Sequence, residues 1–179
     1  MKFTATPLKG AFIVDIEPTR DERGFFARTF CAEEFAAYGL SAADLQCSVS
    51  CNPGKGTLRG MHYQAAPCEE DKLIRCTAGA IFDVIVDIRS GSPSYGRWFG
   101  TELTAANRRA LLAPKGFAHG FLTLADASEV LYMISTRYEP DCARGFHWDD
   151  PNIAIAWPMK PLVISARDAA YGMLDHGSR

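Results

Sequence analysis

The sequence of 179 residues lacks both a long apolar segment and an excess of basic residues. No apolar run approaches the ~20 residues that a membrane-spanning helix needs. Residues 1–10 contain no apolar core of the secretory-signal type, so we expect the chain to stay in the cytoplasm. The net charge of −2 provides no broad basic surface, and partners such as nucleic acid or a membrane are therefore not expected.

Cysteines are present, but no two of the six form a CxxC pair. Cys47 and Cys51 are four residues apart, and no second pair matches them, which argues against a structural zinc site. Thiols in the cytoplasm are kept reduced. We therefore expect most of these cysteines to be small, buried apolar residues.

Repeats, low-complexity tracts and charged tails are also missing, and short strand-like runs recur along the chain instead. The length suits one core, so we expect residues 1–179 to form a single domain. Turn residues such as Asn52, Pro53 and Gly54 separate the runs. The pattern predicts an all-β sandwich or barrel, with a helix over residues 32–38 and a helical turn after Ser165. The expected strands are residues 12–16, 24–30, 47–51, 57–62, 72–76, 80–88, 98–103, 110–113, 117–124, 130–136 and 153–157.

Residues 80–88 alternate as a strand does. Phe82, Val84 and Val86 share one face, and the other face carries Asp83 and Asp87 among apolar residues. Either this face is solvated or Asp83 has a partner inside a barrel, and from this segment alone we expect a solvated face.

Histidine is scarce, with four residues at positions 62, 119, 147 and 176. Strict strand alternation places His62 and Gln64 on one face and Arg59 on the other. His119 follows a Pro-Lys-Gly turn similar to the second box of cupin barrels. The first box of metal-binding cupins is His-x-His followed by Glu, and Gln64 occupies the second histidine position here, with Glu69 or Glu70 after it. Because Gln64 removes an imidazole ligand, we expect no metal site of three histidines and one glutamate.

Sequence motifs follow one another in order over most of the chain. They include DERGFF at 21–26, LRGMHYQ at 58–64, SPSYG at 92–96, GFAHGF at 116–121, WDDP at 148–151 and SARD at 165–168. In these motifs the chain resembles the dTDP-4-dehydrorhamnose 3,5-epimerase family, sugar-nucleotide epimerases of the cupin superfamily. The resemblance implies a cupin-type antiparallel β-sandwich, or jelly-roll barrel, with a few short helices. It also implies an isomerase that inverts carbon-3 and/or carbon-5 of a nucleoside-diphosphate 4-keto-6-deoxy-sugar for deoxysugar biosynthesis.

Inversion of a carbon beside a ketone has chemical requirements of its own. A base removes the proton from one face, an electrophile holds the enolate oxygen, and an acid or water returns a proton to the opposite face. The keto group already acidifies both neighbouring carbons. We therefore expect no cofactor, neither redox group nor metal.

The resemblance also implies roles for individual residues. His62 matches the base, and Asp168 matches the carboxylate that orients and charges it, so the two should lie within hydrogen-bond reach. Lys72 matches the lysine near the keto oxygen, and Tyr132 matches the acid, on a strand face turned toward the cavity. The substrate-binding matches are Arg23, Phe26, Gln46, Ser48, Arg59, His119 and Asp83, with the two arginines on the diphosphate and His119 and Asp83 as a supporting pair.

The family usually builds its site from two chains, which implies a homodimer that shares N-terminal strands across the interface. Arg23 and Phe26 would then act in the neighbouring subunit. Departures from the family pattern at residues 27–29 and 46–48 fall at nucleotide-contacting positions, so the nucleotide (dTDP, CDP or GDP) and the number of inverted carbons stay open.

Other functions stay open as well. A 3,4-ketoisomerase would use the same substrate class. A metal-dependent cupin enzyme would use His62, His119 and Glu69 or Glu70, against which Gln64 argues. A non-catalytic sugar-binding cupin would not require the set of Lys72, Tyr132 and Asp168.

Overall fold

A computed structural model describes residues 1–175, so His176 lies outside the described residues. Strands dominate the structure, and most of the predicted strand runs are present. The strands are β1 (Lys2–Ala5), β2 (Phe12–Asp15), β3 (Thr19–Asp21), β4 (Gly24–Phe26), β5 (Gln46–Asn52), β6 (Thr57–Gln64), β7 (Lys72–Ala78), β8 (Ala80–Asp87), β9 (Trp98–Thr104), β10 (Ala110–Ala113), β11 (Phe117–Thr123), β12 (Ser128–Ile134), β13 (Ala143–Gly145) and β14 (Val163–Ile164). The helices are α1 (Ala32–Ala36) and α2 (Ala166–Ala169).

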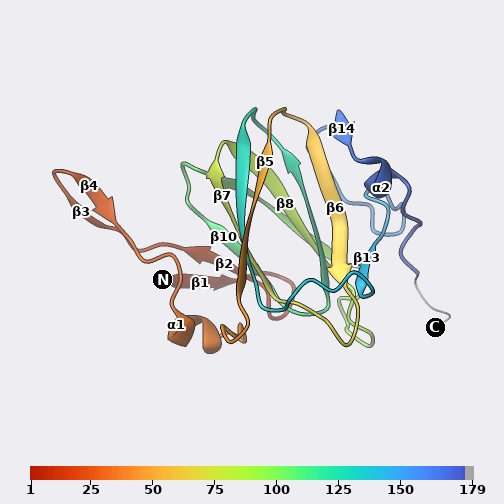
Figure 1. Ribbon diagram of the computed structural model, residues 1–179, viewed down its shortest axis with the longest axis horizontal. Helices are drawn as coiled ribbons and strands as arrows, with labels where there is room; N and C mark the ends of the chain where they lie inside the picture. The colour runs from red at the N-terminus through yellow and green to blue at the C-terminus, as the bar shows by residue number, and fades with distance from the viewer. Residues whose placement is uncertain (176–179) are drawn as a thin grey trace.

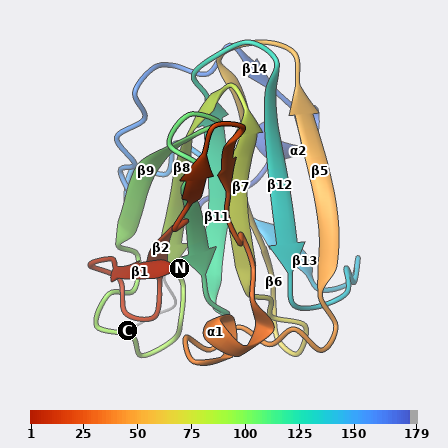
Figure 2. The ribbon, with the colours of Figure 1, turned by 90° about the vertical axis from the view of Figure 1, so that its left-hand side faces the viewer.

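Two antiparallel sheets form the body of the molecule (Figures 1 and 2). The first has the strand order β1-β2-β10-β7-β12-β5, and the second has the order β13-β6-β11-β8-β9, with β14 added to β6 in parallel. Apolar side chains of both sheets, among them Ile74, Ile85, Phe121 and Val130, form one core cluster. Because these residues alternate with outward-facing ones, each strand contributes one face to the core. The predicted cupin-type antiparallel β-sandwich is confirmed.

The expectation of a solvated face on β8 is wrong. Asp83 lies on the same face as Ile81 and Ile85, and that face is the interior of the sandwich, where Asp83 is fully buried. Asp87 is also fully buried, with its carboxylate bound by Arg89 and by nearby serine hydroxyls. Both acids have partners, which a single segment of sequence does not show.

The outer faces of both sheets are covered in part by non-strand segments. Phe35 of α1 packs with Leu73 and Leu112 on the first sheet. The helix ends at residue 36, two residues before its predicted end, and turn residues 37–39 follow. Residues 146–174 cover the second sheet. The predicted strand 153–157 is wrong, because the Ile153 amide donates to the Asp150 carbonyl in a turn, and Ile153 packs on the sheet instead of joining it.

The pairing of β6 with β11 contains a register shift. His62 is paired with His119, whereas Arg59 is paired with Phe121, so β6 has one more residue than β11 between these points. Such an extra residue interrupts the alternation of faces. The prediction that Arg59 and His62 lie on opposite faces is therefore wrong, and both share the inner face. At Gly60 an added Cβ would come within 2.6 Å of the Gly120 Cα, so this close approach needs glycine.

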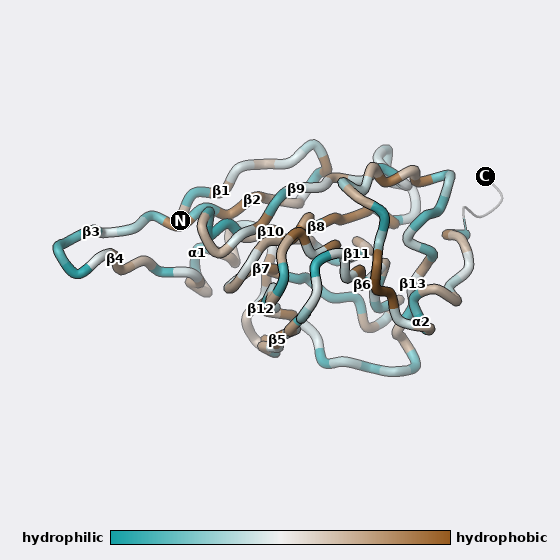
Figure 3. The backbone as a smooth tube through the Cα atoms, turned by 90° about the horizontal axis from the view of Figure 1, so that it is seen from above, coloured by the Kyte–Doolittle hydropathy of each residue, from teal (hydrophilic) through white to brown (hydrophobic). Residues whose placement is uncertain are grey.

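Strands β3 and β4 form a hairpin that projects away from the body, at the left of Figure 1 and Figure 3. The predicted strand 24–30 is shortened to Gly24–Phe26. At its base, the Phe25 ring is contacted by the guanidinium groups of Arg20 and Arg108, at 5.7 and 4.7 Å from the ring centroid. Phe26 is 79% exposed.

The cysteines differ from the prediction. Cys68 and Cys142 form a disulfide, which the expectation of reduced thiols did not include. Backbone pairing brings them together, because the Ala65 amide donates to the Cys142 carbonyl next to the β6–β13 ladder. Among the free cysteines, only Cys76 is buried. No helix within residues 1–175 is long and apolar enough to cross a membrane.

Candidate active site

A cavity of 640 Å³ opens between the two sheets, on the side where β5 and β13 form their edges. Inner-face side chains of both sheets line it, including His62 from β6, Lys72 from β7, His119 from β11 and Tyr132 from β12. A second hollow of 380 Å³ shares His62 with the first and runs along β14 and α2. His62 therefore lies where the two hollows meet.

His62 and Asp168 form a hydrogen-bonded pair at this junction. The distance from His62 Nε2 to Asp168 Oδ1 is 2.8 Å, so the predicted contact is present. Asp168 is held in α2, where Ser165 Oγ accepts a hydrogen bond from the Asp168 amide at the helix start. The Gly60 amide donates to the other carboxylate oxygen. Strand β6 thus binds both carboxylate oxygens, while α2 holds the Asp168 backbone.

The protonation states of this pair follow from its surroundings. Burial alone would raise the pKa of Asp168, but hydrogen bonds from His62 and Gly60 outweigh it and lower that pKa. An ionised Asp168 accepts the proton on His62 Nε2, which leaves the lone pair of a neutral ring on Nδ1. The imidazole side chain is 39% exposed and lines both hollows, so it can take a proton from a bound molecule.

Lys72 brings a positive charge into the same cavity. Its side chain is 10% exposed, and its ammonium is 2.8 Å from Glu70 Oε1. The ammonium also lies 3.4 Å from the His62 carbonyl oxygen. A fixed ammonium in a largely dry site can stabilise an oxyanion that develops beside it.

Tyr132 and His119 line the cavity, and the buried Asp83 lies behind His119. His119 Nε2 is 2.7 Å from Asp83 Oδ1, and the rings of His119 and Tyr132 meet edge to face at 5.9 Å. Burial, and then the negative charge of Asp83, raise the pKa of Tyr132, so its phenol stays neutral and able to donate a proton. Burial also raises the pKa of Asp83, an effect that His119 opposes.

Arg59 lines the second hollow beside His62. Its Nε donates to Asn52 Oδ1 at 2.7 Å, and Asn52 is fully buried. The remaining guanidinium donors are suited to a phosphate. Gln46 and Ser48, on the edge strand β5, line the larger cavity.

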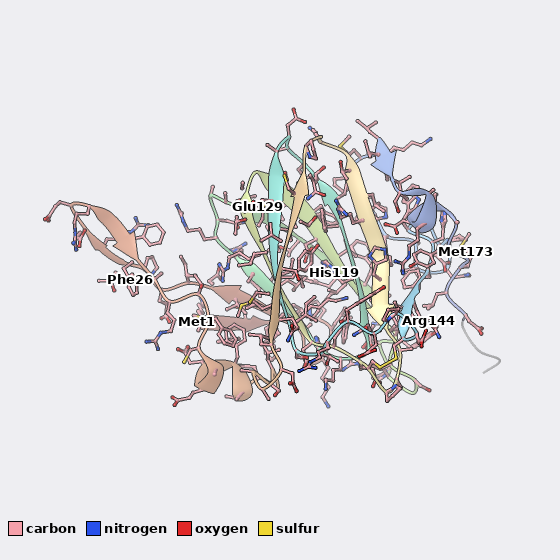
Figure 4. The ribbon with its side chains drawn as sticks, in the orientation of Figure 1. Met1, Phe26, His119, Glu129, Arg144 and Met173 are labelled. Carbon is pink, nitrogen blue, oxygen red and sulfur yellow. A yellow bond between two sulfur atoms is a disulfide. The ribbon has the colours of Figure 1, made fainter. Side chains whose placement is uncertain are left out.

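Arg23 and Phe26 line neither of these two hollows in the single chain. Both belong to the projecting hairpin, and Figure 4 shows Phe26 far from His119, which lies in the middle of the sandwich. Arg23 pairs with Asp21 of the same hairpin and is 83% exposed.

No group of three His, Cys, Asp or Glu side chains within residues 1–175 is placed to hold a metal ion. Gln64, at the histidine position of metal-binding cupins, directs its amide to Glu70 and to backbone groups.

The family described as dTDP-4-dehydrorhamnose 3,5-epimerase matches residues 5–176 of the sequence. This chain belongs to that family. The dTDP-4-dehydrorhamnose 3,5-epimerase of Methanothermobacter thermautotrophicus is 42% identical over 170 residues, which cover 93% of this chain and 91% of the relative. A crystal structure of the Bacillus anthracis 3,5-epimerase with TDP and PPi bound superimposes with a TM-score of 0.92 at 38% identity, covering 97% of this chain and 99% of that chain.

The epimerase family also contains members named for a single inversion. The dTDP-4-dehydrorhamnose 3-epimerase of Streptomyces niveus is 36% identical over 173 residues, which cover 94% of this chain and 81% of that protein. Similarity at this level is thus shared by double and single epimerases.

Sequence reasoning missed several cavity residues of this epimerase-family chain. Tyr138, Arg144 and Arg167 line the larger cavity, and Tyr138 is 63% exposed at its mouth. Arg167 precedes Asp168 in the SARD motif, a signal that could have identified it. Arg144 reaches the cavity because β13 pairs with β6, and no local sequence pattern predicts that pairing.

Proposed function

We propose that this protein inverts carbon-3, carbon-5 or both of a dTDP-linked 4-keto-6-deoxy-sugar by proton transfer, without a cofactor. The observation that carries the proposal is the His62–Asp168 pair at 2.8 Å, whose His62 ring lines the same cavity as Lys72 and Tyr132. Membership of the epimerase family supports the same reaction class. A 4-keto-sugar fits the site, because its ketone acidifies the adjacent C–H groups, from which the base must remove a proton.

In this proposal His62 Nδ1 takes the proton from the carbon beside the ketone. Ionised Asp168 then stabilises the imidazolium that forms, as the acid of a hydrolase triad does. Electron density moves onto the C4 oxygen, where the Lys72 ammonium stabilises the enolate. The Tyr132 hydroxyl gives a proton to the opposite face of the carbon and is reprotonated from solvent. The His62 imidazolium releases its proton to solvent. The net change is inversion, with no group gained or lost.

The substrate is held mainly by its charged diphosphate. Arg59 has free guanidinium donors beside the catalytic pair, and Gln46 and Ser48 line the cavity as nucleotide contacts. His119, supported by Asp83, faces the sugar within the cavity.

We further propose a homodimer in which each hairpin of β3 and β4 reaches the partner's cavity. The exposure of Arg23 and Phe26 and the projection of the hairpin support this arrangement (Figure 1). It would complete the diphosphate and nucleotide contacts that a single chain lacks. A cytoplasmic location stays a prediction.

Incubation in deuterium oxide with 4-keto-sugars linked to dTDP, CDP or GDP tests the reaction directly. We expect deuterium at carbon-3, carbon-5 or both of the dTDP sugar, with proton NMR reporting which carbon exchanges. A 3,4-ketoisomerase would instead give a product whose ketone has moved. Absence of exchange with all three nucleotides would refute the proposal.

A further inference from the structure

Lys72 is held by a contact that the reaction scheme above does not use. Its ammonium and the Glu70 carboxylate are 2.8 Å apart, and both side chains are only 10% exposed. Burial disfavours a charged amine, whereas a neighbouring carboxylate favours it. Glu70 thus provides the negative charge that a buried ammonium needs.

Glu70 is in turn fixed by Gln64, which is 4% exposed. Gln64 Nε2 donates to Glu70 Oε2 at 2.9 Å and lies 3.1 Å from the carbonyl oxygens of both Cys68 and Arg137. Gln64 Oε1 accepts a hydrogen bond from the Glu139 amide at 2.7 Å. This position requires a side chain that both donates and accepts. A carboxylate would place further negative charge against these acceptors.

The donors of the ammonium determine what this arrangement achieves. An ammonium has three N–H donors. One is directed to Glu70, a second lies toward the His62 carbonyl at 3.4 Å, and Lys72 lines the cavity, so the third is free for a bound molecule. Two fixed contacts define where that third donor points.

We propose that Glu70 is a positioning residue, which with Gln64 keeps the Lys72 ammonium aimed at the C4 oxygen. The inference rests on the proposed function, in which Lys72 stabilises the enolate. Glu70 itself acts through Lys72 and does not touch the reacting atoms. Gln64, which takes the place of a metal-binding histidine, therefore holds Glu70 in position beside Lys72.

A double-mutant cycle tests the proposal. Glu70→Gln keeps the size of the side chain and removes its charge, and Lys72→Met removes the partner. We expect Glu70→Gln to lower kcat for deuterium exchange roughly tenfold, part of the loss caused by removing an oxyanion donor, with KM changed less than about twofold. In the Lys72→Met background the same change should have no further effect, because both substitutions affect one interaction.

Glu69→Gln is the matched control. Glu69 neighbours Glu70, but its side chain makes no ion pair in the described part of the chain, so wild-type kinetics are expected. Full additivity in the cycle, or unchanged kcat in Glu70→Gln, would overturn the positioning role. A similar loss in Glu69→Gln would also overturn it.

A second measurement does not depend on activity. Acylation of Lys72 by an amine-specific reagent, followed by peptide mass spectrometry, reports how firmly the ammonium is held. We expect the rate to rise several-fold in Glu70→Gln and to stay unchanged in Glu69→Gln. Equal rates in all variants would refute the positioning role even in an active enzyme. A wild type without any solvent exchange would refute the proposed reaction, while the acylation rates would still decide the positioning of Lys72.

Discussion

Replacement of Asp168 by Asn tests the catalytic pair most directly. The amide fits the same space and can still accept from the Gly60 amide, but the negative charge is lost. With charge centres ~4 Å apart, the attraction between carboxylate and imidazolium is ~4 kcal/mol at an effective dielectric constant of about 20. The His62 ring is 39% exposed, so solvent screening reduces this to about half. A loss of ~2 kcal/mol corresponds to a roughly 30-fold slower proton abstraction.

The tautomer of His62 adds to this loss. An Asn side chain can turn its NH2 group toward Nε2, which would place the ring proton on the nitrogen that must act as the base. The equivalent change in hydrolase triads lowers kcat by ~10⁴-fold. We therefore expect Asp168→Asn to slow deuterium uptake by a factor between ~30 and ~10⁴.

The assay is deuterium incorporation into the 4-keto-sugar, followed by proton NMR under single-turnover conditions so that product release does not mask the chemical step. Asp149→Asn, at an exposed position, is the control and should behave as wild type. Circular dichroism should show that both variants are folded. Exchange by Asp168→Asn within threefold of wild type would refute the role of this carboxylate.

Three further outcomes are expected. Tyr132→Phe should still exchange substrate protons with solvent but give much less inverted product by NMR, and inversion at the wild-type rate would make Tyr132 a packing residue. Burial raises the pKa of Asp87, but its hydrogen bonds outweigh this effect and lower the pKa to about 2. The ionised carboxylate therefore stabilises the fold above pH ~4. Asp87→Asn should therefore lose about 2 kcal/mol of unfolding free energy at pH 7, a difference that urea titrations should show disappearing as the pH falls from 4 to 2. The Cys68–Cys142 disulfide spans 74 residues, so replacing both cysteines with serine should destabilise the oxidised protein by roughly 4 kcal/mol in denaturant titrations, and equal midpoints would refute this.

Local patterns in the sequence were sufficient for most strands and for the sandwich. The inner face of β12 illustrates this, because the alternation of Val130, Tyr132 and Ile134 predicts a common face, and the structure directs it to the core and the cavity. Motif resemblance then selected His62 and Asp168, which the fold brings into contact. Alternation and motifs are properties of short segments, so one sequence carries them.

Features that depend on pairing between distant segments were not predictable. The register shift between β6 and β11 moves Arg59 to the face of His62, and it arises from two strands meeting at Gly60 and Gly120. Residues 153–157 have the apolar spacing of a strand, yet they pack on the outer face of the second sheet and do not pair with any of its strands. Apolar periodicity indicates burial and does not distinguish a strand from a covering segment.

The contacts of Gln64 show the same limit at the candidate site. Its partners in the segment after β12 lie 73 and 75 residues along the chain. Comparison with metal-binding cupins identified Gln64 only by the ligand it removes. Its actual contacts depend on the two loops that follow β6 and β12, which both reach the Gln64 side-chain amide. Neither loop has a sequence pattern that predicts this contact.

The separation of the catalytic pair along the chain has a consequence for how the protein is made. His62 and Asp168 are 106 residues apart, and the carboxylate arrives with one of the last described elements, α2. At translation rates of ~5–20 residues per second, this interval takes about 5–20 s. During that time the ribosome carries a nascent chain whose histidine has no acid to orient it. The proposed base therefore gains its carboxylate partner only after residue 168 has been synthesised, however early the β-sandwich begins to form.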